Sequence, residues 1–278
     1  MVVGGGRGAR YGLRAIALGY LAVILVAPLI FVIWRTFDRG VGTFWDAVSS
    51  PEAVHALWLT LLITAIAVPL NAVFGVAAAL ILVRRRVPGR PLLSALIDLP
   101  LALSPVVVGL CIILVWGQNG WFGGYAQDAG VRVVFAVPGM VLATIFVSLP
   151  FVVREVVPVL REVGTDQEEA ASILGAGAGQ TFWRITLPAI RWGIIYGVVL
   201  TTARALGEYG AVAVVSGRIS GDTETLTLFV KQQHDQLGAD SQAGAYGASV
   251  VLILLAVAVV LLMNLLNRTG GGDGHHGH

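Results

Sequence analysis

Long apolar stretches dominate the chain, and the polar positions gather between them. A membrane-spanning helix needs roughly 20 mostly apolar residues. Six stretches reach that length, and they cover residues 15–33, 57–83, 92–116, 133–153, 193–215 and 245–266. The pattern predicts an all-α, polytopic membrane protein with six transmembrane helices. It divides the chain into a tail (1–14), a transmembrane domain (15–266) and a second tail (267–278).

Helix-breaking residues interrupt two of these stretches. Asp98, Pro100 and Pro105 lie in the third, and Pro138 and Pro150 lie in the fourth. Such residues are tolerated at membrane depth when neighbouring helices satisfy the freed backbone groups. The sequence therefore predicts a packed bundle rather than independent helices.

Composition narrows the class of protein. Hydrophobic residues make up 56% of the 278 positions and charged residues only 12%, with a mean hydropathy of +0.83. A soluble domain carries about 25% charged residues, so a soluble enzyme, a disordered chain and a free nucleic-acid binder are all disfavoured. The net charge of +2 does not indicate a polyanionic partner.

Arginine placement predicts the topology, because cytoplasmic segments of membrane proteins carry an excess of basic residues. If both termini are cytoplasmic, the outer segments hold only Arg35, Arg39, Arg132, Arg218 and Lys231. The inner segments then hold Arg7, Arg10, Arg14, Arg84, Arg85, Arg86, Arg90, Arg154, Arg161, Arg184, Arg191 and Arg268. We interpret the run at residues 84–86 as a topology signal rather than a lipid site. We interpret the first apolar stretch as a membrane helix that stays in the protein rather than as a cleaved signal peptide.

The segment over residues 154–192 is charged and too polar to cross a membrane. Thr165 and Glu168 have the spacing of a capping box, which predicts a helix start. Gly175 lies where a helix would end in the left-handed conformation. A second short helix is predicted over residues 180–187, where a proline ends it. Two short helices on the inner side have the form of an element that docks into a partner.

A sequence motif within this segment resembles a known family. The motif has the pattern EAA-x3-G-x9-I-x-LP and consists of Glu169, Ala170, Ala171, Gly175, Ile185, Leu187 and Pro188. It is similar to the EAA loop of bacterial ABC importer permeases. The resemblance implies the type I ABC importer permease fold and a location in the bacterial cytoplasmic membrane. It also implies that these residues, with Glu168, form the coupling helix that inserts into an ATP-binding subunit.

Further stretches resemble the sulfate and molybdate branch of that family. They cover residues 98–109, 150–158, 203–212 and 223–226, and the surroundings of Asn71 fit sulfate permeases more closely. The resemblance implies a subunit that moves sulfate or thiosulfate into the cytoplasm. A molybdate or tungstate permease is the alternative, and a self-sufficient channel or secondary transporter is a remote one.

The resemblance also implies separate partners. No Walker A pattern occurs, since the glycine-rich residues 175–179 are not followed by Gly-Lys-Ser/Thr. The chain is therefore expected to bind no cofactor, with ATP and Mg²⁺ held by two ATP-binding subunits. A second permease subunit and an extracytoplasmic sulfate- or thiosulfate-binding protein would complete the importer. No catalytic residue or metal site is predicted, because no histidine falls in a span. The histidines at 275, 276 and 278 are expected to form a flexible tail, with binding of a transition metal as the alternative.

Candidate residues for the translocation path lie in the third and fifth stretches. Arg204 and Glu208 are four residues apart and would share a helix face. We favour an internal ion pair that positions the helix. The alternative is that Arg204 contributes to a site for the anion. Asp98 is expected to pair with Arg204 or to cap the segment broken by Pro100.

Hydroxyl groups could donate hydrogen bonds to an anion in the path. The candidates are Ser104, Thr201, Thr202 and Ser216, although a hydroxyl in a helix more often bonds back to its own backbone. Gly193, Gly197 and Thr201 form a stripe of small residues. Such a stripe indicates close approach of another backbone, either within the bundle, along the pore or at a permease–permease interface.

Overall fold

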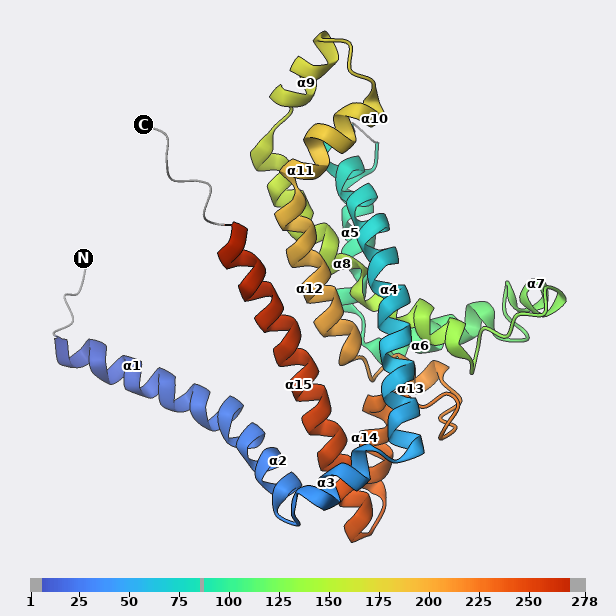
Figure 1. The fold of residues 1–278 in the computed structure, drawn as a ribbon. Helices are drawn as coiled ribbons and strands as arrows, with labels where there is room; N and C mark the ends of the chain where they lie inside the picture. Colours follow the sequence, from blue (N-terminus) through green and yellow to red (C-terminus); the bar gives the residue numbers. More distant parts are fainter. Residues whose placement is uncertain (1–6, 86–87, 271–278) are drawn as a thin grey trace.

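The computed structural model describes residues 7–85 and 88–270, and within these ranges the chain is helical without strands (Figure 1). Four helices are long and apolar enough to cross a membrane: 11–37, 51–84, 137–163 and 239–265. Two bent pairs raise the number to six if each counts as one span. This arrangement agrees with the predicted all-α, polytopic class.

The elements follow one another in a simple order. They are α1 (Arg7–Leu21), η1 (Ala22–Val26), α2 (Ala27–Phe37), α3 (Val41–Val48), α4 (Pro51–Arg84), α5 (Arg90–Ala102), α6 (Pro105–Trp116), α7 (Gly123–Asp128), α8 (Val137–Val163), α9 (Asp166–Ile173), α10 (Ala178–Thr181), η2 (Phe182–Thr186), α11 (Leu187–Ala189), α12 (Arg191–Leu206), α13 (Val212–Val215), α14 (Leu226–Asp235) and α15 (Ala239–Gly270).

Helices α4, α8 and α12 form the centre of the bundle, and small residues let their backbones approach closely. A Cβ atom at Gly75 of α4 would lie 2.7 Å from the Cβ of Val152 on α8. A Cβ at Gly197 of α12 would lie 2.8 Å from the Cα of the same valine, and one at Gly193 would lie 2.9 Å from the carbonyl oxygen of Glu155. The small-residue stripe therefore serves packing within the bundle.

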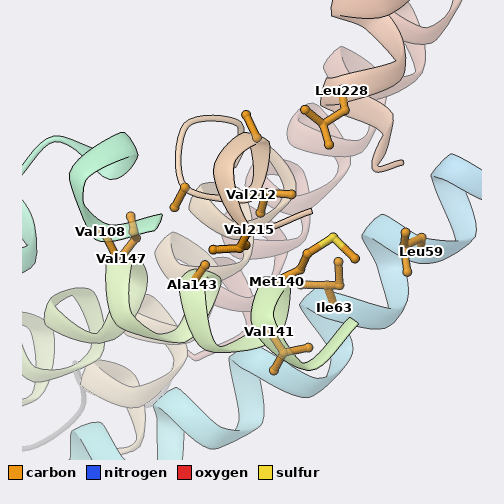
Figure 2. Close-up of a cluster of buried hydrophobic side chains, with 12 residues drawn as sticks. Leu59, Ile63, Val108, Met140, Val141, Ala143, Val147, Val212, Val215 and Leu228 are labelled. Atoms are coloured by element: carbon orange, nitrogen blue, oxygen red, sulfur yellow. The ribbon is translucent and has the colours of Figure 1, made fainter. Parts of the chain in front are cut away.

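A second cluster of buried side chains surrounds the short helix α13. Figure 2 shows Val212 and Val215 of α13 close to Met140 and Ala143 of α8, with Ile63 of α4 beside them. All five side chains are buried. Because burial of apolar surface is the main favourable term in packing, this cluster holds the end of the broken fifth stretch against two long helices.

The third stretch is a broken helix rather than a straight span. Helices α5 and α6 meet at 112°, and Leu103 and Ser104 between them are extended, with ψ angles of 143° and 134°. Pro105 explains the break, since a proline disfavours the helical conformation of the residue before it. Pro100 is accommodated inside α5. Gly210, between α12 and α13, lies against this break, and a Cβ there would be 2.9 Å from the Cβ of Pro105.

Two predicted boundaries differ from the structure. Helix α8 continues to Val163 although the apolar stretch ends at residue 153, because polar residues can extend a helix beyond the apolar layer. The helix predicted over 193–215 ends at Leu206 and resumes at Val212. The Glu208 side chain accepts a hydrogen bond from the backbone N–H of Ala211 (2.8 Å), which stabilises the interruption.

The first span meets the rest of the bundle only toward its C-terminal end. Helix α1 diverges from the other helices in Figure 1, whereas α2 contacts α15, and none of the most apolar window of residues 11–37 is buried within the chain. Its apolar surface is therefore left for lipid or for another subunit.

Candidate functional site

The residues between α8 and α12 project beyond one end of the bundle (Figure 1). We call residues 164–190 the coupling segment. It contains α9, α10, η2 and α11, and the last of these joins α12 across a bend of 68°. The end of α15 points toward the same side of the molecule (Figure 1). We call this side the inner end.

A Schellman motif ends α9, as the sequence predicts. Gly175 has φ of +84°, which glycine adopts without strain. Its N–H donates to the carbonyl of Ser172 (3.0 Å), and the N–H of Ala176 donates to that of Ala171 (3.0 Å). These two bonds satisfy carbonyl groups that a helix end otherwise leaves open.

The start of α9 differs from the predicted capping box. Thr165 precedes the helix but makes no side-chain cap; its hydroxyl donates to Oε1 of Glu169 (2.7 Å). Glu168 does not reach back to the helix start, because Arg84 attracts its carboxylate. A guanidinium–carboxylate pair is stronger than a neutral cap, so the capping prediction was wrong for a clear electrostatic reason.

Arg84 at the end of α4 joins three parts of the chain, in an arrangement that we call the Arg84 brace. Its guanidinium lies 3.0 Å from Oε2 of Glu168 and donates to the carbonyls of Leu160 (3.0 Å) and Gly164 (2.5 Å). The Thr186 hydroxyl donates to Oε1 of Glu168 (2.9 Å). Both charged side chains are mostly buried. The brace therefore fixes the coupling segment to the ends of α4 and α8.

Apolar side chains at the tip of the coupling segment are exposed. Ile173 is 84% exposed, Leu174 87% and Trp183 68%, and we call these three side chains the tip. Large exposed apolar groups favour contact with another protein. The tip therefore has the form of a docking surface for another protein.

The motif residues divide between this surface and its support. Glu169, Ala170 and Pro188 are exposed, whereas Ile185 and Leu187 are half-buried. Ala171 is buried. The motif thus supplies both exposed positions and the packing that holds them.

Pro188 does not end the second short helix, contrary to expectation. Helical structure runs from Ala178 through Ala189. The N–H of Leu187 donates to the carbonyl of Phe182, five residues earlier. Such a widened turn accommodates the missing N–H of the proline.

Arg204 and Glu208 form the internal pair that the sequence favours. The guanidinium Nη2 lies 2.6 Å from Oε2 of Glu208, whose side chain is 2% exposed. They do not share one helix, since α12 ends at Leu206. The Glu208 backbone carbonyl accepts from the Thr227 hydroxyl (2.8 Å). Glu208 therefore ties α12, α13 and α14 together.

Asp98 pairs with neither predicted partner. Its Oδ1 lies 3.0 Å from Nε of Arg154 on α8. The expectation that Asp98 would pair with Arg204 or cap the broken segment was wrong, because α5 packs along α8 and brings a closer arginine to it.

The four hydroxyls lie in different surroundings. Thr202 bonds back to the carbonyl of Val198 (2.7 Å), as expected of a helical threonine. Thr201 is fully buried and its hydroxyl has no hydrogen-bond partner among the described residues. The Ser216 hydroxyl accepts from the N–H of Arg218 (3.0 Å), and Ser104 is exposed at the α5–α6 break.

Sequence reasoning missed the roles of Arg84 and Thr186. Arg84 belongs to a basic run that positive-inside bias explains by itself, so the sequence contains no sign of its partner. Thr186 lies between two motif positions, but nothing in the spacing predicts that its hydroxyl meets Glu168.

Comparisons with known proteins agree with this architecture. Residues 71–269 match the family described as binding-protein-dependent transport system inner membrane component. The chain is 50% identical over 267 residues to the sulfate transport system permease protein CysW of Synechocystis sp., covering 96% of this chain and 95% of that protein. It is 43% identical over 272 residues to CysW of Escherichia coli K12, covering 95% and 92%.

A solved structure shares the fold at low identity. It is the crystal structure of a bacterial ABC transporter involved in the import of the acidic polysaccharide alginate, with a TM-score of 0.77 and 18% identity over 95% of this chain and 96% of that chain. The fold is therefore that of an ABC importer permease, and the chain is a multi-pass membrane protein. It belongs to the family of binding-protein-dependent transport system inner membrane components.

Proposed function

We propose that this chain is a permease subunit of an ATP-driven importer that moves sulfate or thiosulfate into the cytoplasm. The observation that carries the proposal is the coupling segment, an exposed apolar tip held on the ends of two long helices by the Arg84 brace. The near full-length likeness to bacterial sulfate permeases supports the choice of solute.

The ATP-binding partners would dock on the tip formed by Ile173, Leu174 and Trp183. A push on α9 would pass through Glu168 and Arg84 to α4, and through α11 to α12 across their bend. ATP binding by two such subunits would close them and open the bundle outward, and hydrolysis would reset it. The chain itself would bind no cofactor and catalyse no reaction.

The other partners follow from the same scheme. A second permease subunit would form a heterodimer with this chain, and the unburied first span at residues 11–37 offers it apolar surface. An extracytoplasmic sulfate- or thiosulfate-binding protein would deliver the solute. Both termini would then be cytoplasmic, on the side of the coupling segment.

The translocation path would pass the two breaks, where α5–α6 meets α12–α13. The six residues that we place along the path or its gate are Asp98, Ser104, Thr201, Arg204, Glu208 and Ser216. The exposed hydroxyl of Ser104 is available to donate a hydrogen bond, and the buried, unpaired hydroxyl of Thr201 would become available only if the helices around it separate. Glu208 neutralises Arg204, so we assign this pair to holding the gate rather than to binding the anion.

An uptake experiment tests the choice of solute. Cells that lack their own sulfate and molybdate importers would receive this chain with a second permease, ATP-binding subunits and a binding protein, and labelled sulfate, thiosulfate and molybdate would be offered separately. We expect ATP-dependent uptake of sulfate or thiosulfate. Uptake of molybdate alone would overturn the choice in favour of the molybdate or tungstate branch.

Co-purification tests the proposed assembly. The tagged chain, extracted from the membrane and analysed by mass spectrometry, should retain a second permease and an ATP-binding subunit. Recovery of the chain by itself in an active preparation would contradict an ABC importer.

A further inference from the structure

A basic groove runs between α5 and α8 at the inner end of the bundle, separate from the coupling segment's tip. Its volume is about 360 Å³, and we call it the inner groove. The residues that matter for its chemistry are Arg90, Ser94 and Asp98 of α5 and Arg154, Pro158 and Arg161 of α8.

Helix geometry places these residues on facing sides. Arg154 and Arg161 are seven residues apart, so they lie on one face of α8 about 10 Å apart along the axis. Arg90 and Asp98 are eight residues apart, which is about 12 Å along α5. The groove is thus an elongated channel lined along its length, rather than a pit at one point.

The charges of the inner groove are not balanced. Asp98 is the only carboxylate among its lining residues, and its Oδ1 lies 3.0 Å from Nε of Arg154. Arg90 and Arg161 form no ion pair within residues 7–85 and 88–270, and both are exposed. An arginine side chain cannot give up its charge. Two positive charges therefore face the groove without a counter-ion from the described chain.

Further groups at the groove favour an anion of a particular shape. Guanidinium groups present several N–H donors and bind oxyanions bidentately. The half-buried Ser94 adds a hydroxyl between Arg90 and Asp98. Arg90 also begins α5, where the helix dipole is positive.

We propose that the inner groove binds a tetrahedral oxyanion of one or two negative charges, which Arg90 and Arg161 hold with support from Ser94 and the Arg154–Asp98 pair. The anion is free sulfate leaving the path or the phosphate of an anionic lipid headgroup, since both present negatively charged oxygens around a tetrahedral centre. The sulfate source rests on the proposed function, whereas the affinity of the groove for an oxyanion does not.

Cysteine labelling in the full-length chain tests the charge of the groove. The native Cys111 is first replaced by serine, and Ser94→Cys or Ala95→Cys is then introduced. Ala95 is the matched control, because it neighbours Ser94 on α5, is exposed and does not line the groove. The protein is placed in nanodiscs of phosphatidylcholine, and modification by negatively charged sulfonatoethyl methanethiosulfonate is compared with that by its trimethylammonium counterpart.

The groove should favour the negative reagent at position 94 more than at position 95. Arg161→Gln should lower that preference at Ser94→Cys roughly threefold to tenfold, and Arg161→Lys should preserve most of it. Because Arg161→Lys keeps the charge, it separates loss of charge from loss of fold. An unchanged preference in Arg161→Gln would overturn the proposal.

Two further arms identify the source of the oxyanion. In phosphatidylcholine nanodiscs, sodium sulfate is compared with sodium chloride at equal ionic strength; slower labelling of Ser94→Cys by sulfate, without an effect at Ala95→Cys, supports the free ion. Slower labelling only when phosphatidylglycerol is included supports the lipid headgroup. Protection by neither overturns the site.

The labelling requires neither uptake nor the ATP-binding subunits. A groove that binds sulfate in a chain that transports none would overturn the proposed function alone. Normal sulfate uptake with no protection at Ser94→Cys would overturn the inner groove alone.

Discussion

At the scale of single residues, a few charged side chains fix the relations between helices. Arg84 reaches Glu168 and two backbone carbonyls, and Glu208 connects Arg204 with the backbone of Ala211. Both side chains are mostly buried. In the protein interior, a charged hydrogen bond contributes more than it does on the surface. These side chains therefore act as fixed joints between elements that are otherwise held by apolar packing.

Replacing Arg84 should loosen the coupling segment. Arg84→Ala removes the hydrogen bonds to Leu160 and Gly164 and leaves Glu168 unpaired, which we expect to cost about 2 kcal/mol of stability. Thermal unfolding of the purified chain and proteolysis of residues 164–190 would measure this. Arg85→Ala is the matched control, since Arg85 is exposed and one position away. Equal behaviour of the two variants would contradict the Arg84 brace.

Glu224 should make the stability of the outer segment depend on pH. It lies between α13 and α14, outside the spans, and burial raises the pKa of its carboxyl, with Glu52 adding to the rise and Ser220 opposing it. The folded state therefore holds the proton more tightly than the unfolded state. Stability from this group is present at a pH below the ordinary carboxyl value and falls as pH rises toward the folded pKa.

Glu224→Gln removes that dependence. We expect the variant to melt at a higher temperature than the parent chain at pH 7, with the difference vanishing near pH 4.5. Melting curves of detergent-purified protein between these values would show it. The exposed neighbour Asp222, changed to asparagine, serves as control. A constant difference across the range would argue against a carboxyl whose pKa is raised by burial.

At the scale of elements, the sequence predicts helices better than their ends and breaks. Gly175 allowed the end of α9 to be placed correctly, because a left-handed cap has a local signature. The pair Arg204–Glu208 forms as predicted, although the shared helix that the spacing implied ends at Leu206. The interruption of the helix after Leu206 could not be predicted from the sequence, because it depends on α13 packing against Met140 and Ile63, which are distant in the chain.

Tertiary partners are the part that the sequence could not supply. The spacing of Thr165 and Glu168 predicted a local cap. The Glu168 carboxylate instead pairs with Arg84, which is 84 residues away in the sequence. The same holds for Asp98, whose partner Arg154 is 56 residues away. Local rules were overruled wherever a charged side chain from another helix came within reach.

Changing Gly175 should weaken docking of the ATP-binding subunit. Gly175→Asp forces a non-glycine residue to a φ of +84°, which costs about 1–2 kcal/mol and distorts the end of α9. We expect normal insertion in the membrane and less co-purified ATP-binding subunit. Gly177→Asp is the control, because φ there is −72° and the space around it is open. Co-purification of Gly175→Asp at the parent level would contradict the docking role.

Enlarging Gly197 should separate the central helices. Gly197→Val places a side chain where even a Cβ would lie 2.8 Å from the Cα of Val152. Overpacking of this kind costs about 1–3 kcal/mol, so the yield and the melting temperature of the purified chain should fall. Gly19→Val in the first span meets no atom within 4 Å and should have little effect. A similar loss in both variants would point to helix propensity instead of packing.

At the scale of the whole molecule, the chain leaves large apolar surfaces uncovered. The first span buries none of its most apolar window, and the tip of the coupling segment exposes Ile173 and Leu174. The chain also lacks a Walker A sequence. These features agree with the proposed role of one subunit in a larger assembly.

Reconstitution should show this dependence directly. Liposomes that contain the purified chain alone should take up no labelled sulfate above protein-free liposomes. Adding the second permease, the ATP-binding subunits, the binding protein and ATP should establish uptake. Robust uptake by the chain alone would instead favour a channel or secondary transporter.

The exposed tip has a consequence for how a cell handles this protein before assembly. If the proposed ATP-binding subunit covers this surface, a newly made copy presents uncovered isoleucine, leucine and tryptophan side chains to the surrounding solution until that subunit binds. Chaperones and proteases act on proteins with such exposed apolar side chains. Unassembled copies would be degraded, whereas complete complexes would cover the exposed side chains. The proposed docking surface would then also control the ratio of the subunits.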